Sequence, residues 1–173
     1  MTGHLALCYS FLMSITYYED VNLYDKTRSA GYALTEEEIL DFSRKWEPEP
    51  YHTDLEVADN SVFSGLVAPF GLIFCIMMKL AIEAQPGRAD ISALGVEEMR
   101  FVSPVRPGDV LTTEFGAISK RLSSSRPDAG IAVWEHKMTN QRGAIVLTCK
   151  AIGMIKRRPS SANERGAETA GKS

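Results

Sequence analysis

Apolar residues recur at helical spacing in the segment that follows Thr35. Ile39, Phe42 and Trp46 lie three or four positions apart and therefore predict a helix with one buried face. The start of this helix carries a capping box, because the Thr35 hydroxyl can accept from the third helical amide while Glu38 reaches back. We therefore expect an amphipathic helix that begins directly after Thr35.

Two prolines end this helix. Pro48 and Pro50 cannot donate the backbone hydrogen bonds that would continue it, and each biases the residue before it toward extended geometry. The sequence thus predicts an extended turn after the helix. His52 follows that turn directly.

A second helix is predicted over residues 71–84, and Pro86 and Gly87 stop it. Its first two turns contain the run LIFCIMM and have no polar face. A surface helix of a small protein is amphipathic, so a helix that is apolar all round must be enclosed on most sides. Cys75 lies within this run and is predicted to be a buried small hydrophobe.

The rest of the chain has the composition of long strands. Four such stretches alternate with segments typical of turns, and they cover residues 94–102, 109–120, 130–139 and 144–156. Helices early and antiparallel strands late favour an α+β fold over a parallel βαβ fold. A single hotdog domain, in which an antiparallel sheet wraps around a buried central helix, accounts for both the strands and the apolar helix.

The composition is typical of an ordinary globular domain. The chain has 173 residues, of which 45% are hydrophobic and 24% charged, so one domain is expected. The net charge of −3 lacks the basic excess that nucleic acid or an anionic membrane surface would require. The three cysteines form no disulfide framework, which favours a cytoplasmic location, and the histidines show no zinc-site spacing. We therefore expect no metal, no other cofactor, and no nucleic-acid or membrane partner.

The two ends of the chain are set apart from this domain. Residues 5–15 are apolar but lack the basic start and the small-residue cleavage site of a secretory signal. We interpret residues 1–12 as a dispensable extension upstream of a native start at Met13, and residues 13–158 as the folded domain. Residues 159–173 are small and polar, which predicts a disordered tail.

Three stretches of the sequence resemble one protein family. Residues 42–58, FSRKWEPEPYHTDLEVA, are similar to a hydratase signature of an aromatic residue, an acid, a proline, a histidine and a downstream alanine. Residues 63–72, FSGLVAPFGL, are similar to the segment that enters the family's central helix, and residues 99–147 contain the phrases PVRPGD and SRPDAG. In this order, the phrases resemble the MaoC-like dehydratases over roughly residues 17–157.

The resemblance implies a fold, an assembly and an activity. The implied fold is a single hotdog, usually a homodimer whose two sheets join edge to edge. The implied activity is reversible hydration of a 2-enoyl thioester, usually on coenzyme A. The family's catalytic aspartate falls on Glu47 and its histidine on His52, while the Asn or Gln position between them is Glu49. Two departures from the family pattern are the glutamate in place of aspartate and a glycine shifted by one position in PFG, residues 69–71.

The implied chemistry needs a base for water, an acid for C2 and donors for the enolate oxygen. A carboxylate and an imidazole, here Glu47 and His52, can hold one water and exchange protons near neutral pH. The thioester carbonyl would bind at the start of the apolar helix, at Phe70 and Gly71, where free amides favour negative charge. The extra methylene of Glu47 moves its carboxylate, and a displacement of about an ångström can cost about 100-fold in rate.

Structural roles are the alternatives for each residue. His52 alone could bind a turn carbonyl, and Glu49 has the pattern of a solvated surface acid. His136 is predicted to serve packing or an interface. Arg126 is assigned to a turn ion pair with Asp128 in preference to a contact with a substrate phosphate.

Two other functions are open alternatives. A hotdog thioesterase would carry an acid on the buried helix, and residues 72–78 contain none. A non-catalytic hotdog that binds an acyl thioester or a partner protein is the alternative from another class. The two departures from the family pattern keep that alternative open.

Overall fold

The computed structural model describes residues 15–159 of the chain. Its helices are the 3-10 turn η1 (Tyr18–Asp20), α1 (Glu36–Trp46), α2 (Pro50–Thr53), α3 (Leu55–Asp59) and α4 (Phe70–Ala84). Its strands are β1 (Lys26–Arg28), β2 (Tyr32–Ala33), β3 (Asp90–Phe101), β4 (Val110–Leu122), β5 (Ala129–Thr139) and β6 (Ile145–Lys156). Within residues 15–159, no helix is long and apolar enough to cross a membrane.

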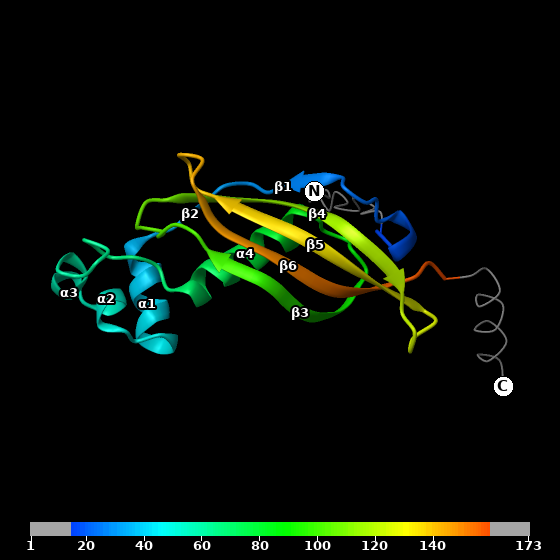
Figure 1. Cartoon of the computed structure of the whole chain (residues 1–173), viewed down its shortest axis with the longest axis horizontal. Helices are drawn as coiled ribbons and strands as arrows, with labels where there is room; N and C mark the ends of the chain where they lie inside the picture. Colours follow the sequence, from blue (N-terminus) through cyan, green and yellow to red (C-terminus); the bar gives the residue numbers. More distant parts are fainter. Residues whose placement is uncertain (1–14, 160–173) are drawn as a thin grey trace, which may run out of the picture.

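All the strands belong to one antiparallel sheet. Its order is β1-β4-β5-β6-β3, and β2 also pairs with β4. The chain folds back on itself from β4 to β5 to β6, whereas β3 comes earlier in the sequence and pairs with β6. Figure 1 shows α4 running along one face of this sheet, with α1, α2 and α3 gathered at one end of it.

The core lies between α4 and the sheet. Side chains at every second position of a strand share one face, and in β5 the inward positions are buried while Glu135 and Lys137 between them are exposed. The buried residues of α4 are Ile73, Ile76, Met77, Leu80 and Ala81. The predicted α+β architecture, an antiparallel sheet packed on one central helix, is confirmed.

The central helix is less enclosed than the sequence predicts. In the single chain the sheet covers only part of α4, and Phe70 with 59% and Ile82 with 57% of its surface are exposed. Cys75 is exposed too, so the prediction that it is buried was wrong. The apolar run correctly indicated that α4 packs against the sheet. The described residues of one chain, however, cover only part of the helix surface.

The first helix has the predicted start, but its last turn is more exposed than predicted. Thr35 accepts a hydrogen bond from the Glu38 amide at 3.2 Å, and the Glu38 carboxylate accepts from the Thr35 amide at 3.0 Å, which confirms the capping box. Ile39 is fully buried, but Trp46 is 67% exposed, contrary to the expected continuous buried face. α1 lies at the end of the sheet, so its last turn extends beyond the core, and the Lys45 ammonium sits 5.0 Å from the Trp46 ring centroid.

The segment after α1 is not simply an extended turn. The helix ends at Trp46 as predicted, but Pro50 starts the one-turn helix α2, and His52 lies within it. The fixed φ angle of proline suits the first position of a helix, where a missing amide costs no hydrogen bond. The short helix turns the His52 side chain inward, and the residue is only 5% exposed.

The four predicted long strands are present with shifted ends. β3 begins at Asp90 rather than at residue 94, while β5 and β6 lie close to their expected ranges. The hairpin between β5 and β6 closes as predicted through a hydrogen bond of 2.9 Å from the Gly143 amide to the Asn140 carbonyl. The predicted extension over residues 1–12 and the tail beyond residue 159 lie outside the described residues.

Candidate active site

Glu47 and His52 face each other beside the start of α4. Glu47 is the residue that follows α1, and His52 lies in α2, so the turn with two prolines between them sets their separation. The Nε2 atom of His52 lies 3.9 Å from the Oε1 atom of Glu47. This distance is too long for a direct hydrogen bond, and a water between the two groups could contact both.

A backbone carbonyl determines which ring nitrogen of His52 carries the proton. The Nδ1 atom of His52 lies 2.7 Å from the carbonyl oxygen of Val67. A carbonyl oxygen only accepts hydrogen bonds, so Nδ1 must carry a proton and donate it. In the neutral imidazole, Nε2 then has a free lone pair on the side of Glu47.

A pocket of about 320 Å³ opens in front of this pair. Its walls are mostly apolar and aromatic, and they come from α2, the loop before α4, the first turn of α4 and the end of β3. They consist of Glu47, Tyr51, His52, Phe63, Val67, Ala68, Phe70, Ile73, Phe101, Val102, Ser103 and Pro104. An apolar hollow with a few convergent polar groups is the usual form of a small-molecule site.

The glycine at the start of α4 allows close packing around the carboxylate. A Cβ atom placed on Gly71 would lie 3.2 Å from the Cζ atom of Phe42 and 3.7 Å from the Oε2 atom of Glu47. Glu47 therefore lies against the first turn of α4, where amides lack partners within the helix. The four residues selected from the sequence, Glu47, His52, Phe70 and Gly71, thus meet in one region of the structure.

The sequence did not identify the aromatic walls. The Tyr51 ring packs on His52 with a centroid distance of 4.4 Å, and the Phe63 ring centroid lies 5.6 Å from that of Tyr51. Phe101, at the end of β3, meets Phe70 edge to face at 5.7 Å. Tyr51 had a local signal as the immediate neighbour of His52, but Phe101 is brought in only by the sheet.

The residues given structural roles lie where those roles require. Glu49 is exposed, and Arg126 pairs with Asp128 at 2.8 Å within its turn. His136 is 4% exposed and stacks on Phe115 with the ring centroids 5.1 Å apart. The prediction of packing for His136 and of a turn ion pair for Arg126 is confirmed.

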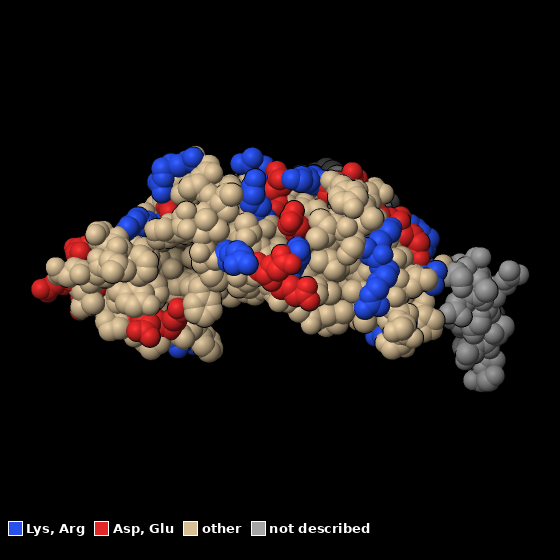
Figure 2. All heavy atoms as spheres, in the orientation of Figure 1, with Lys and Arg blue, Asp and Glu red and all other residues tan. Residues whose placement is uncertain are grey.

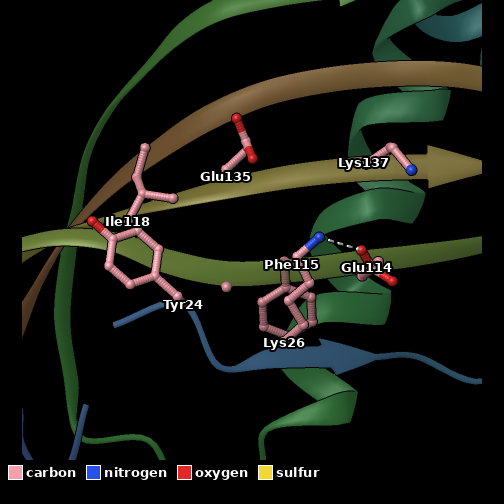
Figure 3. A pocket seen from close by; sticks show the side chains of 8 residues that line it. Tyr24, Lys26, Glu114, Phe115, Ile118, Glu135 and Lys137 are labelled. Carbon is pink, nitrogen blue, oxygen red and sulfur yellow. Dashed lines mark hydrogen bonds and ion pairs between the residues drawn. The ribbon is translucent and has the colours of Figure 1, made fainter. Parts of the chain in front are cut away.

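The outer face of the sheet has a different character. Figure 2 shows acidic and basic side chains interspersed on the visible face, without a broad area of one sign. A hollow of about 250 Å³ lies there beside β1, β4 and β5, with Tyr24 and Lys26 on one side (Figure 3). Lys26 forms an ion pair with Glu114 at 2.9 Å. The lining of this hollow contains no histidine, so the hollow offers no acid–base pair like that of Glu47 and His52.

The chain is similar to known proteins in sequence. Residues 22–134 match the family described as MaoC like domain. The uncharacterized protein YdeM of Bacillus subtilis is 31% identical over 134 residues, which cover 76% of this chain and 92% of YdeM. A mesaconyl-CoA hydratase of Haloarcula marismortui is 32% identical over 75 residues, which cover 43% of this chain and 21% of that enzyme.

A solved structure shows the same fold over nearly the whole described chain. The MaoC-like dehydratase from Rhodospirillum rubrum has a TM-score of 0.78 and 32% sequence identity, and the match covers 84% of this chain and 99% of that one. The family match over residues 22–134 includes the turn with Glu47 and His52 and the central helix α4. This chain belongs to the MaoC-like domain family.

Proposed function

We propose that the protein is a hydro-lyase that adds water to, or removes it from, the 2,3-position of an acyl thioester. The observation that carries this proposal is the approach of His52 Nε2 to Glu47 Oε1 at 3.9 Å within one apolar pocket. The family includes hydratases, and the similarity to a mesaconyl-CoA hydratase supports a thioester substrate.

The proton transfers follow from the fixed His52 tautomer. Nδ1 is held by the Val67 carbonyl, so Nε2 is the ring atom that can take a proton from a water held against Glu47. The hydroxyl oxygen of that water bonds to C3 as the C2–C3 double bond opens. The pair then delivers one proton to C2, so its own protonation is unchanged over one cycle.

The start of α4 is suited to the enolate that forms between these steps. Its capping position is Pro69, whose side chain makes no capping hydrogen bond, so amides of the first turn remain open. The thioester oxygen would accept from amides at Phe70 and Gly71, and the positive end of the helix dipole favours its negative charge. Phe70 lines the pocket, which supports this placement.

We infer that the working form is a homodimer. β3 is at one edge of the sheet and pairs only with β6 among the described strands. The apolar side chains Leu94, Val96, Phe101 and Val102 on or just after it are exposed in the single chain. An open apolar edge favours pairing with a second copy. Light scattering that shows a stable monomer at micromolar concentration would contradict this inference.

Hydration of crotonyl-CoA by the purified protein is the direct test. We expect loss of the enoyl absorbance with the wild-type protein and with Glu49→Gln, a matched control that changes an exposed acid near the site. His52→Ala should be nearly inactive while remaining folded. If the wild-type protein binds acyl thioesters of several lengths but hydrates none of them, a non-catalytic binding role replaces this proposal.

A further inference from the structure

The phrase PVRPGD, residues 104–109, folds into a turn that its last residue holds together. The Asp109 side chain is buried, and its carboxylate accepts from the Arg106 amide at 3.0 Å and from the Arg142 guanidinium at 2.9 Å. Val105 is fully buried within the same turn. Hydrogen bonds to a carboxylate are among the stronger ones in proteins, so the 104–109 turn is held in one geometry.

Two hydrogen bonds join this turn to residues 61–68, the segment that leads to α4. The guanidinium of Arg106 donates to the carbonyl of Phe63, and the amide of Ala68 donates to the carbonyl of Val105 at 2.8 Å. The segment forms neither helix nor strand. Its position therefore depends on individual hydrogen bonds of this kind and not on a ladder.

Gly65 leaves room for the Arg106 guanidinium in this segment. A Cβ atom placed on Gly65 would lie 2.9 Å from the Nη1 atom of Arg106, which is closer than real Cβ contacts. The φ angle of Gly65 is also +131°, a conformation that glycine adopts far more readily than other residues. The missing side chain thus permits the guanidinium to lie directly against the backbone of the segment.

The same segment provides two supports for His52. The Val67 carbonyl accepts from Nδ1 of His52 at 2.7 Å, and the amide of the same peptide group, that of Ala68, is bonded to the turn. The Phe63 ring centroid lies 5.6 Å from that of Tyr51, which in turn packs on His52 at 4.4 Å. The imidazole is therefore supported at Nδ1 directly and at its ring through Tyr51.

We propose that Arg106 is a positioning residue for His52. It holds residues 61–68 against the 104–109 turn and thereby keeps the Val67 carbonyl and the Phe63 ring where they orient the imidazole. Arg106 is not among the residues that line the pocket, so it acts through these contacts and not on the substrate. The effect on turnover rests on the proposed hydratase function, whereas the effect on the imidazole does not.

The state of the His52 ring can be measured without any substrate. The chain has three histidines, and the spectrum of His52→Ala identifies the ¹⁵N NMR signals of His52. At about pH 8, where an ordinary imidazole is neutral, the wild type should show a protonated Nδ1 and an unprotonated Nε2. Arg106→Met removes the donor to Phe63, and the Nδ1 proton should then exchange with water about 10-fold faster or more. Arg100→Met, which changes an exposed arginine next to the pocket, is the matched control and should leave the His52 signals unchanged.

Kinetics on crotonyl-CoA extend the test to turnover. A displacement of about an ångström can cost about 100-fold in rate, so a smaller shift of the imidazole in Arg106→Met should lower kcat by about 10-fold. The KM should change less, because the arginine does not contact the substrate. Arg106→Lys keeps a donor for the Phe63 carbonyl and should recover part of the loss in kcat and in Nδ1 protection.

A purely structural role for Arg106 gives a different result. Urea denaturation would then show a loss of stability in Arg106→Met, while the His52 signals and the kcat of the folded variant would match the wild type, and this outcome would overturn the proposal. If Arg106→Met does not fold, the same measurements are made on Arg106→Gln, which is shorter but keeps a polar end, with the same expected directions. If the wild type hydrates no thioester, the hydratase function fails, yet faster exchange at Nδ1 in the Arg106 variant still supports the positioning role.

Discussion

Two buried histidines beside the same helix have opposite surroundings. His52 is 5% exposed and His136 is 4% exposed, and each lines a hollow next to α4. His52 donates to the Val67 carbonyl and faces Glu47, whereas Nδ1 of His136 has no partner among the described residues. Burial alone therefore does not indicate the role of a histidine. The role of a buried histidine is indicated by the groups that hold its proton and by the groups that face its other ring nitrogen.

Backbone geometry explains the difference. Val67 lies in a loop, where its carbonyl is not engaged in a ladder and can accept from a side chain. His136 lies in the middle of β5, between β4 and β6, where backbone groups on both sides bond to neighbouring strands. A strand interior thus leaves few carbonyls for a histidine side chain, while a loop around a short helix leaves several.

Removal of the His52 ring should have the largest effect. His52→Ala deletes the nitrogen that exchanges protons with water, so we expect turnover to fall by about 100-fold or more. The circular dichroism spectrum should be unchanged, since α2 is a single turn of helix and lies at one end of the sheet. Steady-state kinetics on crotonyl-CoA provide the measurement. A similar loss of turnover in His136→Phe would contradict the different roles given to the two histidines, because the His136 ring lies in a separate cavity.

Glu47 variants test the other half of the pair. Glu47→Gln is nearly isosteric but cannot accept a proton, so we expect a loss of about 100-fold in kcat. Glu47→Asp restores the family's usual acid and should keep or raise activity if the backbone holds the shorter side chain near His52. Retention of the full rate by Glu47→Gln would show that the carboxylate does not take part. Glu49→Gln serves as the control in the same assay.

Much of this architecture was predictable from local patterns. The Thr35 capping box, the apolar run of α4 and the hairpin at Gly143 depend on neighbours in sequence, and all three are confirmed. The exposure of Trp46 and Cys75 was not predictable in this way, because it depends on which parts of each helix the rest of the fold covers. Periodicity shows that a face is apolar, but it does not show what covers that face.

The site was predictable where its residues are close in sequence. Glu47 and His52 share one turn, and the prolines between them indicated that their spacing is fixed. The partner of His52 was not predictable, because Val67 belongs to the loop before α4 and has an ordinary backbone carbonyl. Phe101 was likewise missed, since it reaches the pocket only through the fold of β3.

The low pKa of His136 should appear as a dependence of stability on pH. An unfolded histidine titrates near pH 6.5, whereas burial and Arg88 lower the pKa of folded His136 to about 4. Between these values the unfolded chain binds the extra proton, so the folded state loses stability as the pH falls from 6.5 toward 4. Above pH 6.5 both states are neutral, and the full contribution is present.

His136→Phe isolates this contribution. The free energy of unfolding of the variant minus that of the wild type should rise by about 2 kcal/mol between about pH 7.5 and about pH 4.5. Urea denaturation at both pH values measures it. If the difference in free energy of unfolding is the same at both pH values, His136 is either protonated or hydrated in the folded state. The contrast with His52 would then be wrong.

The smallest effect concerns the helix that supplies Glu47. Thr35→Ala removes the hydroxyl that accepts from the Glu38 amide at 3.2 Å, and loss of such a cap costs about 1 kcal/mol. We expect urea denaturation to show this loss of stability, with Thr35→Ser as the matched control that keeps the hydroxyl. Glu47 follows α1 at its other end, and the prolines after it hold the turn independently of the cap. Crotonyl-CoA turnover by folded Thr35→Ala should therefore stay close to that of the wild type. A large fall in kcat with only a small loss of stability would show that the whole of α1, and not the turn between Glu47 and His52, sets the geometry of the pair.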